Sequence, residues 1–308
     1  MKPQRKPARK TDVAIIGLGN WGTSLAAALQ RARIPLREVI VRRRKPSSSL
    51  PIVTWKNAAL DARILWLCVP DSAISDTAAE IVRHRPDLRG QIVVHSSGAL
   101  TIDVLDLARR APDHRHRPAI ASIHPVMTFP TRNPVPLDGV LFGVEASNPA
   151  ARRTLHQIIR KLGGTPFNIP SNKALYHAAG TLASPLLVSQ LHAAIEAARL
   201  AGLHPRTGAR WVEALATATA RNLFARGPSR SFSGPFARGD AHTIHLHLQA
   251  LHAHPILADV YRSLAMHAIA TLPVRNDQAL FEALRQQPAQ KSAVPLGKTR
   301  KRPTRMRN

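Results

Sequence analysis

Residues 13–22 read Val13-Ala14-Ile15-Ile16-Gly17-Leu18-Gly19-Asn20-Trp21-Gly22, and this stretch decides the fold. Its four leading apolar residues predict a short buried strand, and Thr23 to Gln30 predicts a helix rich in Ala and Leu. In a G-x-G-x-x-G turn, Gly17 permits the tight bend, Gly19 lets the backbone approach a pyrophosphate, and Gly22 lets the helix pack on the strand. The free N–H groups of the helix N-terminus favour negative charge. Residues 17–22 therefore predict a dinucleotide-binding turn.

The second strand of such a unit decides which dinucleotide is bound. We expect this strand at Arg37 to Val41, followed by Arg42, Arg43, Arg44 and Lys45. An acidic residue here would accept hydrogen bonds from the ribose 2′-OH of NAD, whereas a guanidinium pairs with the 2′-phosphate of NADP. The alternative is a general bias toward Arg, which outnumbers Lys 34 to 10 in this chain. The absence of an acid favours NADP, with Arg42 and Arg43 as contacts.

Further strands extend the first one into a sheet. Ile64 to Val69 is a continuous apolar run, typical of a central parallel strand, and it ends at Pro70. Because ligands bind at the carboxyl ends of such strands, we expect Val69 and Pro70 to contact the cofactor. Further expected strands lie at 92–94, 119–123, 140–145 and 165–169, and expected helices at 73–83, 101–110 and 149–162. This alternation predicts a parallel α/β sheet domain over residues 11–168.

The remaining chain is predicted to be helical, over residues 169–285. From Asn172 to about Leu203 it is apolar on nearly all sides, with Pro185 expected to kink it. Such a helix needs burial, often against a second subunit, so we expect a homodimer. Further helices are expected at 206–224, 256–272 and 277–285, and one that runs to His252 and is capped by Asp240.

Composition excludes several classes of protein. The single cysteine, Cys68, rules out a disulfide framework and fits a reducing compartment. No run approaches the roughly 18 apolar residues of a membrane span. The basic first ten residues lead into the glycine turn instead of an apolar signal segment, so we expect a cytoplasmic protein.

The formal net charge of +26 is concentrated partly at the ends of the chain. Residues 1–10 carry five Lys or Arg and residues 291–308 carry seven, with no acidic residue in either segment. Basic tails can bind nucleic acid through phosphate contacts, but no aromatic residues interleave with them. We expect disordered tails at 1–10 and 286–308 and no specific nucleic-acid binding.

Four motifs carry a resemblance to known proteins: His95-Ser96-Ser97-Gly98-Ala99-Leu100, His124-Pro125, Tyr176-His177-Ala178-Ala179, and Gly234-Pro235 through Asp240. With the glycine turn and the helical second half, the chain resembles the superfamily of 6-phosphogluconate dehydrogenase, pyrroline-5-carboxylate reductase, ketopantoate reductase and prephenate dehydrogenase. It is most similar to a bacterial group that joins a Rossmann-like domain to a helical domain of unknown function. The resemblance implies an oxidoreductase with a helical substrate and dimerisation domain. Pro185 stands where that group leads us to expect Asn.

Hydride transfer to a carbonyl or imine needs a nearby proton donor, and the candidates are His95, His124, Lys173 and His177. The resemblance to prephenate dehydrogenases, in which a similar His-Pro follows the corresponding strand, favours His124. Lys173 and His177 share one helix face. Related β-hydroxyacid dehydrogenases place Lys and Asn at this spacing to polarise substrate, so His177 replaces the Asn. Ser96 is a candidate contact for the nicotinamide amide.

A metal site is less favoured by the sequence. Five histidines lie between His242 and His254, but no Cys or carboxylate joins them at a recognised metal-ligand spacing, so we expect no metal. The predicted function is an NADP-dependent reductase or dehydrogenase acting on a small, anionic carbonyl or imine compound. The alternatives are a non-catalytic NADP-binding regulator or scaffold, and a nucleic-acid-associated protein that uses its tails.

Overall fold

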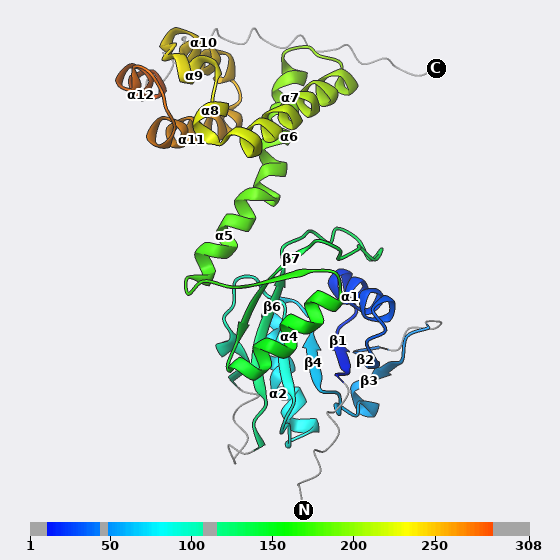
Figure 1. The fold of residues 1–308 in the computed structure, drawn as a ribbon. Helices are drawn as coiled ribbons and strands as arrows, with labels where there is room; N and C mark the ends of the chain where they lie inside the picture. The colour runs from blue at the N-terminus through cyan, green and yellow to red at the C-terminus, as the bar shows by residue number, and fades with distance from the viewer. Residues whose placement is uncertain (1–10, 44–48, 107–115, 286–308) are drawn as a thin grey trace, which may run out of the picture. The chain divides into compact units, whose positions relative to one another are not determined.

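The computed structural model describes residues 11–43, 49–106 and 116–285 (Figure 1). The predicted tails, Arg44, Lys45 and the end of the helix predicted at 101–110 lie outside these residues. The chain divides into two compact units, the first ending at Ser184 and the second beginning at Pro185. The first unit therefore includes helix α5 (Lys173–Ala183), which the sequence prediction assigned to the helical domain.

An eight-stranded sheet forms the centre of the first unit, with strand order β3-β2-β1-β4-β5-β6-β7-β8. The chain runs outward from β1 to β2 and β3, then returns to the other side of β1 with β4, so the strand order reverses between β1 and β4. In open α/β sheets, ligands bind in the crevice at such a reversal. The strands are β1 (Val13–Ile16), β2 (Leu36–Val41), β3 (Ile52–Thr54), β4 (Ile64–Leu67), β5 (Ile92–His95), β6 (Ala119–Pro125), β7 (Leu141–Ala146) and β8 (Thr165–Asn168).

The sheet is mostly parallel, which confirms the predicted fold class except at one junction. Strand β7 is antiparallel to β6, with His124 opposite Gly143. A parallel pair needs a crossover, usually a helix, but residues 126–140 contain three prolines and form no helix. The chain therefore turns back directly, and Val126 donates a hydrogen bond to the carbonyl oxygen of Leu141 (2.9 Å). The predicted parallel sheet therefore has one antiparallel pair, β6 with β7.

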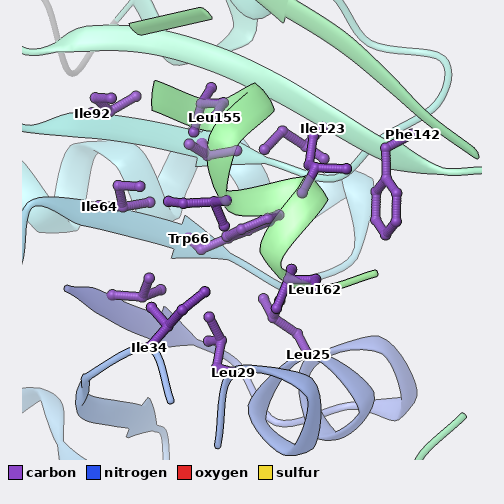
Figure 2. Packing of buried hydrophobic residues seen from close by; sticks show 14 of the residues in the cluster. Leu25, Leu29, Ile34, Ile64, Trp66, Ile92, Ile123, Phe142, Leu155 and Leu162 are labelled. Atoms are coloured by element: carbon purple, nitrogen blue, oxygen red, sulfur yellow. The ribbon is translucent and has the colours of Figure 1, made fainter. Parts of the chain in front are cut away.

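Alternating side chains of the strands build two cores, one on each face of the sheet. Val13 and Ile15 belong to the core covered by α1 (Asn20–Arg31) and α4 (Pro149–Lys161). Ala14 and Ile16 belong to the opposite core, which α2 (Ile74–His84) covers. Figure 2 shows the first core, where the fully buried Trp66 lies among Ile64, Ile123 and Leu155. The two packed faces leave the carboxyl ends of β1 and β4 as the place for a ligand.

Short elements account for the remaining differences from the predicted first unit. Edge strand β3 was missed because only three residues pair with β2. Two 3-10 turns, η1 (Trp55–Asn57) and η2 (Asp71–Ala73), precede β4 and α2. The described start of the helix expected from Thr101 is the 3-10 turn η3 (Ile102–Leu105).

The second unit is helical, as predicted. Its helices are α6 (Pro185–Leu200), α7 (Pro205–Arg226), α8 (Pro228–Ser231), α9 (Gly234–Arg238), α10 (Ala241–Leu251), α11 (Pro255–Thr271) and α12 (Asp277–Arg285). The carboxylate of Asp240 accepts a hydrogen bond from the backbone N–H of Thr243 (3.0 Å), which confirms the predicted cap of α10. A small core joins α10, α11 and α12 through Ile244, Ile269 and Leu280.

The apolar stretch predicted at 172–203 forms two helices, because the chain breaks at Ser184 before Pro185. Of the described residues, Lys173–Leu200 is long and apolar enough to cross a membrane by length and composition, and its most apolar window contains no buried residue. Leu182 on α5 and Val188 on α6 are 66% and 68% exposed.

Candidate functional site

The glycine turn has the geometry that binding a pyrophosphate requires. Gly17 has φ = +100°, and a Cβ there would collide with the carbonyl oxygen of Cys68. A Cβ on Gly22 would collide with the carbonyl of Gly17, so both positions need glycine. A Cβ on Gly19 would meet no described atom within 4 Å. Gly19 precedes the first turn of α1, so its open face leaves room for a phosphate at the helix N-terminus.

A first cavity of about 600 Å³ opens from this turn toward β2. Gly17, Leu18 and Gly19 line one part of it, and Arg42 and Arg43, directly after β2, line another. The side chains of Arg42 and Arg43 are exposed. Trp55 and Arg132, which the sequence prediction did not single out, also line it. An arrangement of open glycine turn and guanidinium groups fits the adenosine half of a phosphorylated dinucleotide.

A second cavity of about 420 Å³ adjoins the first. Both are lined by the same four residues, Gly19, Cys68, Val69 and Pro70, so they share one wall at the ends of β1 and β4. The second cavity continues past Asn20 and Trp21 to Ser96 and His124. The predicted cofactor contacts thus line one of the two cavities, except Gly22, which lies behind the turn.

His124 is the only predicted catalytic candidate that lines either described cavity. It lies within β6, near its end, whereas the sequence placed it just after the strand. Its Nδ1 is 2.7 Å from the hydroxyl oxygen of Tyr176 on α5. The pKa of His124 is lowered to about 4, mainly by burial and also by His177 and Lys173, while Asp71 acts in the opposite direction. The ring is therefore neutral at pH 7, with one nitrogen as donor and the other as acceptor.

The His124 ring packs directly on the backbone of Gly98, where any side chain would displace it. A Cβ on Gly98 would lie 2.7 Å from Nε2 of His124 and would also collide with the ring of His177. The rings of His124 and His177 meet edge to face, with centroids 5.7 Å apart. The two rings and the Gly98 backbone are therefore packed together.

Ser96 is held in an unusual way by two tryptophans. The indole N–H of Trp21 donates to its Oγ at 2.8 Å, and the indole N–H of Trp66 donates to the same atom at 2.9 Å. A hydroxyl has two acceptor lone pairs and one donor hydrogen, and the two indoles occupy both lone pairs. Ser96 can therefore act toward the second cavity only as a hydrogen-bond donor.

Lys173 lies in a buried polar cluster behind the cavities. Its Nζ donates to Ser122 Oγ at 2.7 Å and lies 3.2 Å from Glu145 Oε2. Burial lowers the pKa of Lys173, and Glu145 raises it. Because its charge is already compensated, the structure gives Lys173 a structural position beside β6 and β7 and does not bring it to the cavity.

His95 is fully buried at the end of β5. Its Nδ1 accepts from the backbone N–H of Ser97 (3.1 Å), and its Nε2 lies 3.2 Å from the carbonyl oxygen of Thr101. Both ring nitrogens are occupied by the turn that follows β5. The pKa of His95 is lowered to about 3, chiefly by burial. The structure places this candidate in the turn and away from both cavities.

Sequence reasoning did not single out several residues of this site: Trp55, Trp66, Asp71, Arg132 and Tyr176. Asp71 lines the second cavity and accepts the hydroxyl hydrogen of Ser97 (2.7 Å). Tyr176 lies in a motif that carried the resemblance, and its place just before His177 was the available signal. Trp66 and Arg132 carry no local signal, because their contacts are with residues distant in sequence. Among the described residues, no group of three metal-ligating side chains is found.

Comparison with known families matches the two halves of the chain separately. Residues 2–112 match the model of a Rossmann-like domain, and residues 140–268 match that of a domain of unknown function, DUF2520. The chain combines a Rossmann-like domain with a DUF2520 domain. This confirms the resemblance drawn from the sequence motifs. No curated protein matches the chain.

Solved structures share the fold of this Rossmann–DUF2520 chain at low identity. A proposed NADP oxidoreductase from Bacteroides fragilis is 21% identical, with TM-score 0.66, over 84% of this chain and 97% of that one. An imine reductase from Myxococcus stipitatus in complex with NADP⁺ is 16% identical, with TM-score 0.59, over 89% and 100%. A Plasmodium falciparum pyrroline carboxylate reductase with NADP bound is 14% identical, with TM-score 0.57, over 90% and 98%. At these identities the likeness establishes the fold.

Proposed function

We propose that this protein is an NADP-dependent oxidoreductase that transfers a hydride between NADP(H) and a small carbonyl or imine compound. One observation carries the proposal: adjoining cavities run from the open glycine turn and Arg42 at one end to His124 at the other. Two of the structural neighbours are reductases with NADP bound, which supports the same activity. The non-catalytic regulator remains the alternative to be excluded by turnover.

Residues of the first cavity would hold the adenosine half of the cofactor. The open face of Gly19 and the N–H groups of the first turn of α1 would accept the pyrophosphate. Arg42 and Arg43 would pair with the 2′-phosphate. Ser96, as a donor, would hydrogen-bond the carboxamide oxygen at the nicotinamide end. Bound NADPH supplies a hydride for the substrate carbon.

His124 and Tyr176 would move the proton that accompanies the hydride. Burial raises the pKa of Tyr176, so its hydroxyl stays protonated and can donate to Nδ1 of His124. This places the ring proton on Nε2, from which it would pass to the oxygen or nitrogen of the substrate while Nδ1 takes the proton of Tyr176. Tyr176 is only half-buried, so solvent can restore its proton. In the oxidative direction the transfers would reverse: once Tyr176 has released its proton to solvent, the ring holds its proton on Nδ1. Nε2 then accepts the substrate proton while Nδ1 returns its proton to the tyrosine oxygen.

The charged groups around the second cavity do not select an anionic substrate. Lys173 is paired with Glu145, and Asp71 places a carboxylate at the second cavity. The ring of His177 adjoins that of His124, with centroids 5.7 Å apart. The substrate screen should therefore include anionic 2-keto and 3-keto acids together with neutral and cationic cyclic imines.

We also propose that the protein is a cytoplasmic homodimer assembled through its helical part. Within the second unit, Trp211 on α7 is 54% exposed and Phe224 is 88% exposed. Exposed aromatic side chains of this size favour a protein partner. Sedimentation at micromolar concentration should give a dimer, and Phe224→Glu should weaken it. A monomeric wild type would contradict the assembly.

Two measurements test the function. NADPH and NADH are titrated into the wild type, with quenching of Trp55 and Trp21, which line the two cavities, as the signal. Charge-assisted pairs predict about 10- to 100-fold tighter binding of NADPH, and Arg42→Asp with Arg43→Ala should abolish the preference. Equal wild-type affinities would refute the cofactor assignment. Binding of NADPH without oxidation by any screened substrate would favour the regulator.

A further inference from the structure

The loop between β6 and β7, residues 126–140, contributes a cation to the first cavity. Arg132 lies near the middle of this loop and lines the cavity together with Gly17, Gly19, Arg42 and Arg43. Of the described residues lining this cavity, the charged ones are these three arginines, with no acid among them. The cavity is therefore strongly positive, and part of that charge comes from a segment some 90 residues beyond β2 in the chain.

Contacts on both sides of Arg132 fix the loop to the first turns of α1. The side-chain amide of Asn20 donates to the carbonyl oxygen of Phe129 (2.8 Å), and the Phe129 ring packs on Trp21 with centroids 5.0 Å apart. Beyond Arg132, the backbone N–H of Val135 donates to Ser24 Oγ (3.1 Å). In Figure 1 this segment, which leads into β7, passes over α1.

Further anchoring restricts the loop between these tethers. Leu137 is fully buried in the core beneath α1. Prolines at 130, 134 and 136 fix backbone φ angles on both sides of Arg132, which reduces the number of conformations that the loop can adopt. Arg132 is thus presented to the cavity by a segment held at 129, 135 and 137.

The position of the tethers indicates which phosphate Arg132 reaches. Asn20 and Ser24 lie in the first two turns of α1, directly after the glycine turn, where a pyrophosphate is expected. Arg42 and Arg43 lie at the end of β2, where the ribose 2′-phosphate is expected. The two groups of arginines therefore enter the cavity from different elements with different expected ligands.

We propose that Arg132 binds the pyrophosphate of the dinucleotide in the first cavity, beside the glycine turn. This inference rests on the proposed function, because it concerns the same cofactor. A guanidinium donates paired hydrogen bonds to phosphate oxygens, and the backbone N–H groups of the glycine turn add single hydrogen bonds. Arg132 contributes affinity that NADH and NADPH share, whereas Arg42 and Arg43 contribute the preference between them.

The test is a comparison of dissociation constants for both nucleotides. Arg132→Ala should raise the Kd of NADPH and of NADH by the same factor, about 10-fold for one charge-assisted contact. Arg42→Ala should raise the Kd of NADPH alone. Arg132→Lys should recover part of the affinity, since Lys keeps the charge without the paired donors. Arg153 is an exposed residue of α4 outside both cavities. Arg153→Ala removes one positive charge there and should change neither Kd.

Each other outcome has a defined meaning. Unchanged affinities in Arg132→Ala would overturn the inference. A loss restricted to NADPH would also overturn it, because Arg132 would then contact the 2′-phosphate. Failure of the wild type to bind either nucleotide would contradict the proposed function itself. Because Arg132 is exposed, its replacement leaves the core intact, and an unchanged melting temperature without nucleotide verifies this.

Discussion

Replacing Gly98 by Ala should separate catalysis from cofactor binding. The added Cβ would lie 2.7 Å from Nε2 and 2.9 Å from Cε1 of His124, whereas ordinary contact begins at 3.4 Å. The ring must therefore move by about 0.7 Å, and the ring of His177 must move as well. Misplacing a catalytic group by about 1 Å can cost about 10²-fold in rate, so we expect kcat to fall by roughly 10- to 100-fold.

The assay is NADPH oxidation with the substrate identified by screening, together with NADPH titration. The Kd of NADPH should stay within about 2-fold, because Gly98 lines neither described cavity. Gly180→Ala on α5 is the matched control: a Cβ there meets no described atom within 4 Å. That variant should keep full kcat and be stabilised by up to about 1 kcal/mol, since Ala favours helix. If Gly98→Ala retains wild-type kcat, the packed position of His124 is irrelevant to the chemistry.

Two further predictions concern Tyr176 and His95. Tyr176→Phe removes the hydroxyl 2.7 Å from His124 Nδ1 and should lower kcat by about 10-fold or more with NADPH affinity unchanged. Steady-state kinetics check this. An undiminished kcat would show that Tyr176 takes no part in the proton transfer. The pKa of His95 is lowered to about 3 in the folded protein, against about 6.5 in the unfolded chain. Burial of the neutral ring therefore contributes stability that is fully present above about pH 6.5 and is lost as the pH falls toward 3. Between pH 7 and pH 5 urea unfolding should show a loss of about 2 kcal/mol that His95→Asn does not show, and equal losses in both proteins would contradict the buried position of His95.

The first strand, turn and helix could be predicted from sequence because each depends on neighbouring residues. Val13 to Ile16 are all buried, Gly17 adopts a positive φ, and α1 follows directly. Asp240 was predictable for the same reason, since its partner Thr243 is three residues away. Local chemistry determines such features, so a single sequence reveals them.

Features that depend on distant segments could not be predicted. The turn that occupies both ring nitrogens of His95 is itself held by Asp71, 26 residues away, which accepts a hydrogen bond from Ser97. The resemblance predicted that Lys173 contacts the substrate, but in the structure it contacts Ser122 of β6 and Glu145 of β7. The reversal of β7 follows from a proline-containing loop whose path depends on its tethers to α1. Tyr176 meets His124 only because α5 packs beside the end of β6, 52 residues earlier in the chain.

The most direct measurement is the effect of His124→Asn on kcat and on NADPH affinity. His124 lines the second cavity and is hydrogen-bonded to Tyr176, away from the glycine turn. Loss of general acid–base catalysis costs about 10²- to 10⁴-fold, so kcat should fall by that factor while the Kd of NADPH stays within about 2-fold. His177→Asn, measured alongside, reports whether His177 shares this catalytic role with His124. Full kcat in His124→Asn would contradict the assignment of this cavity as the site of hydride transfer assisted by His124.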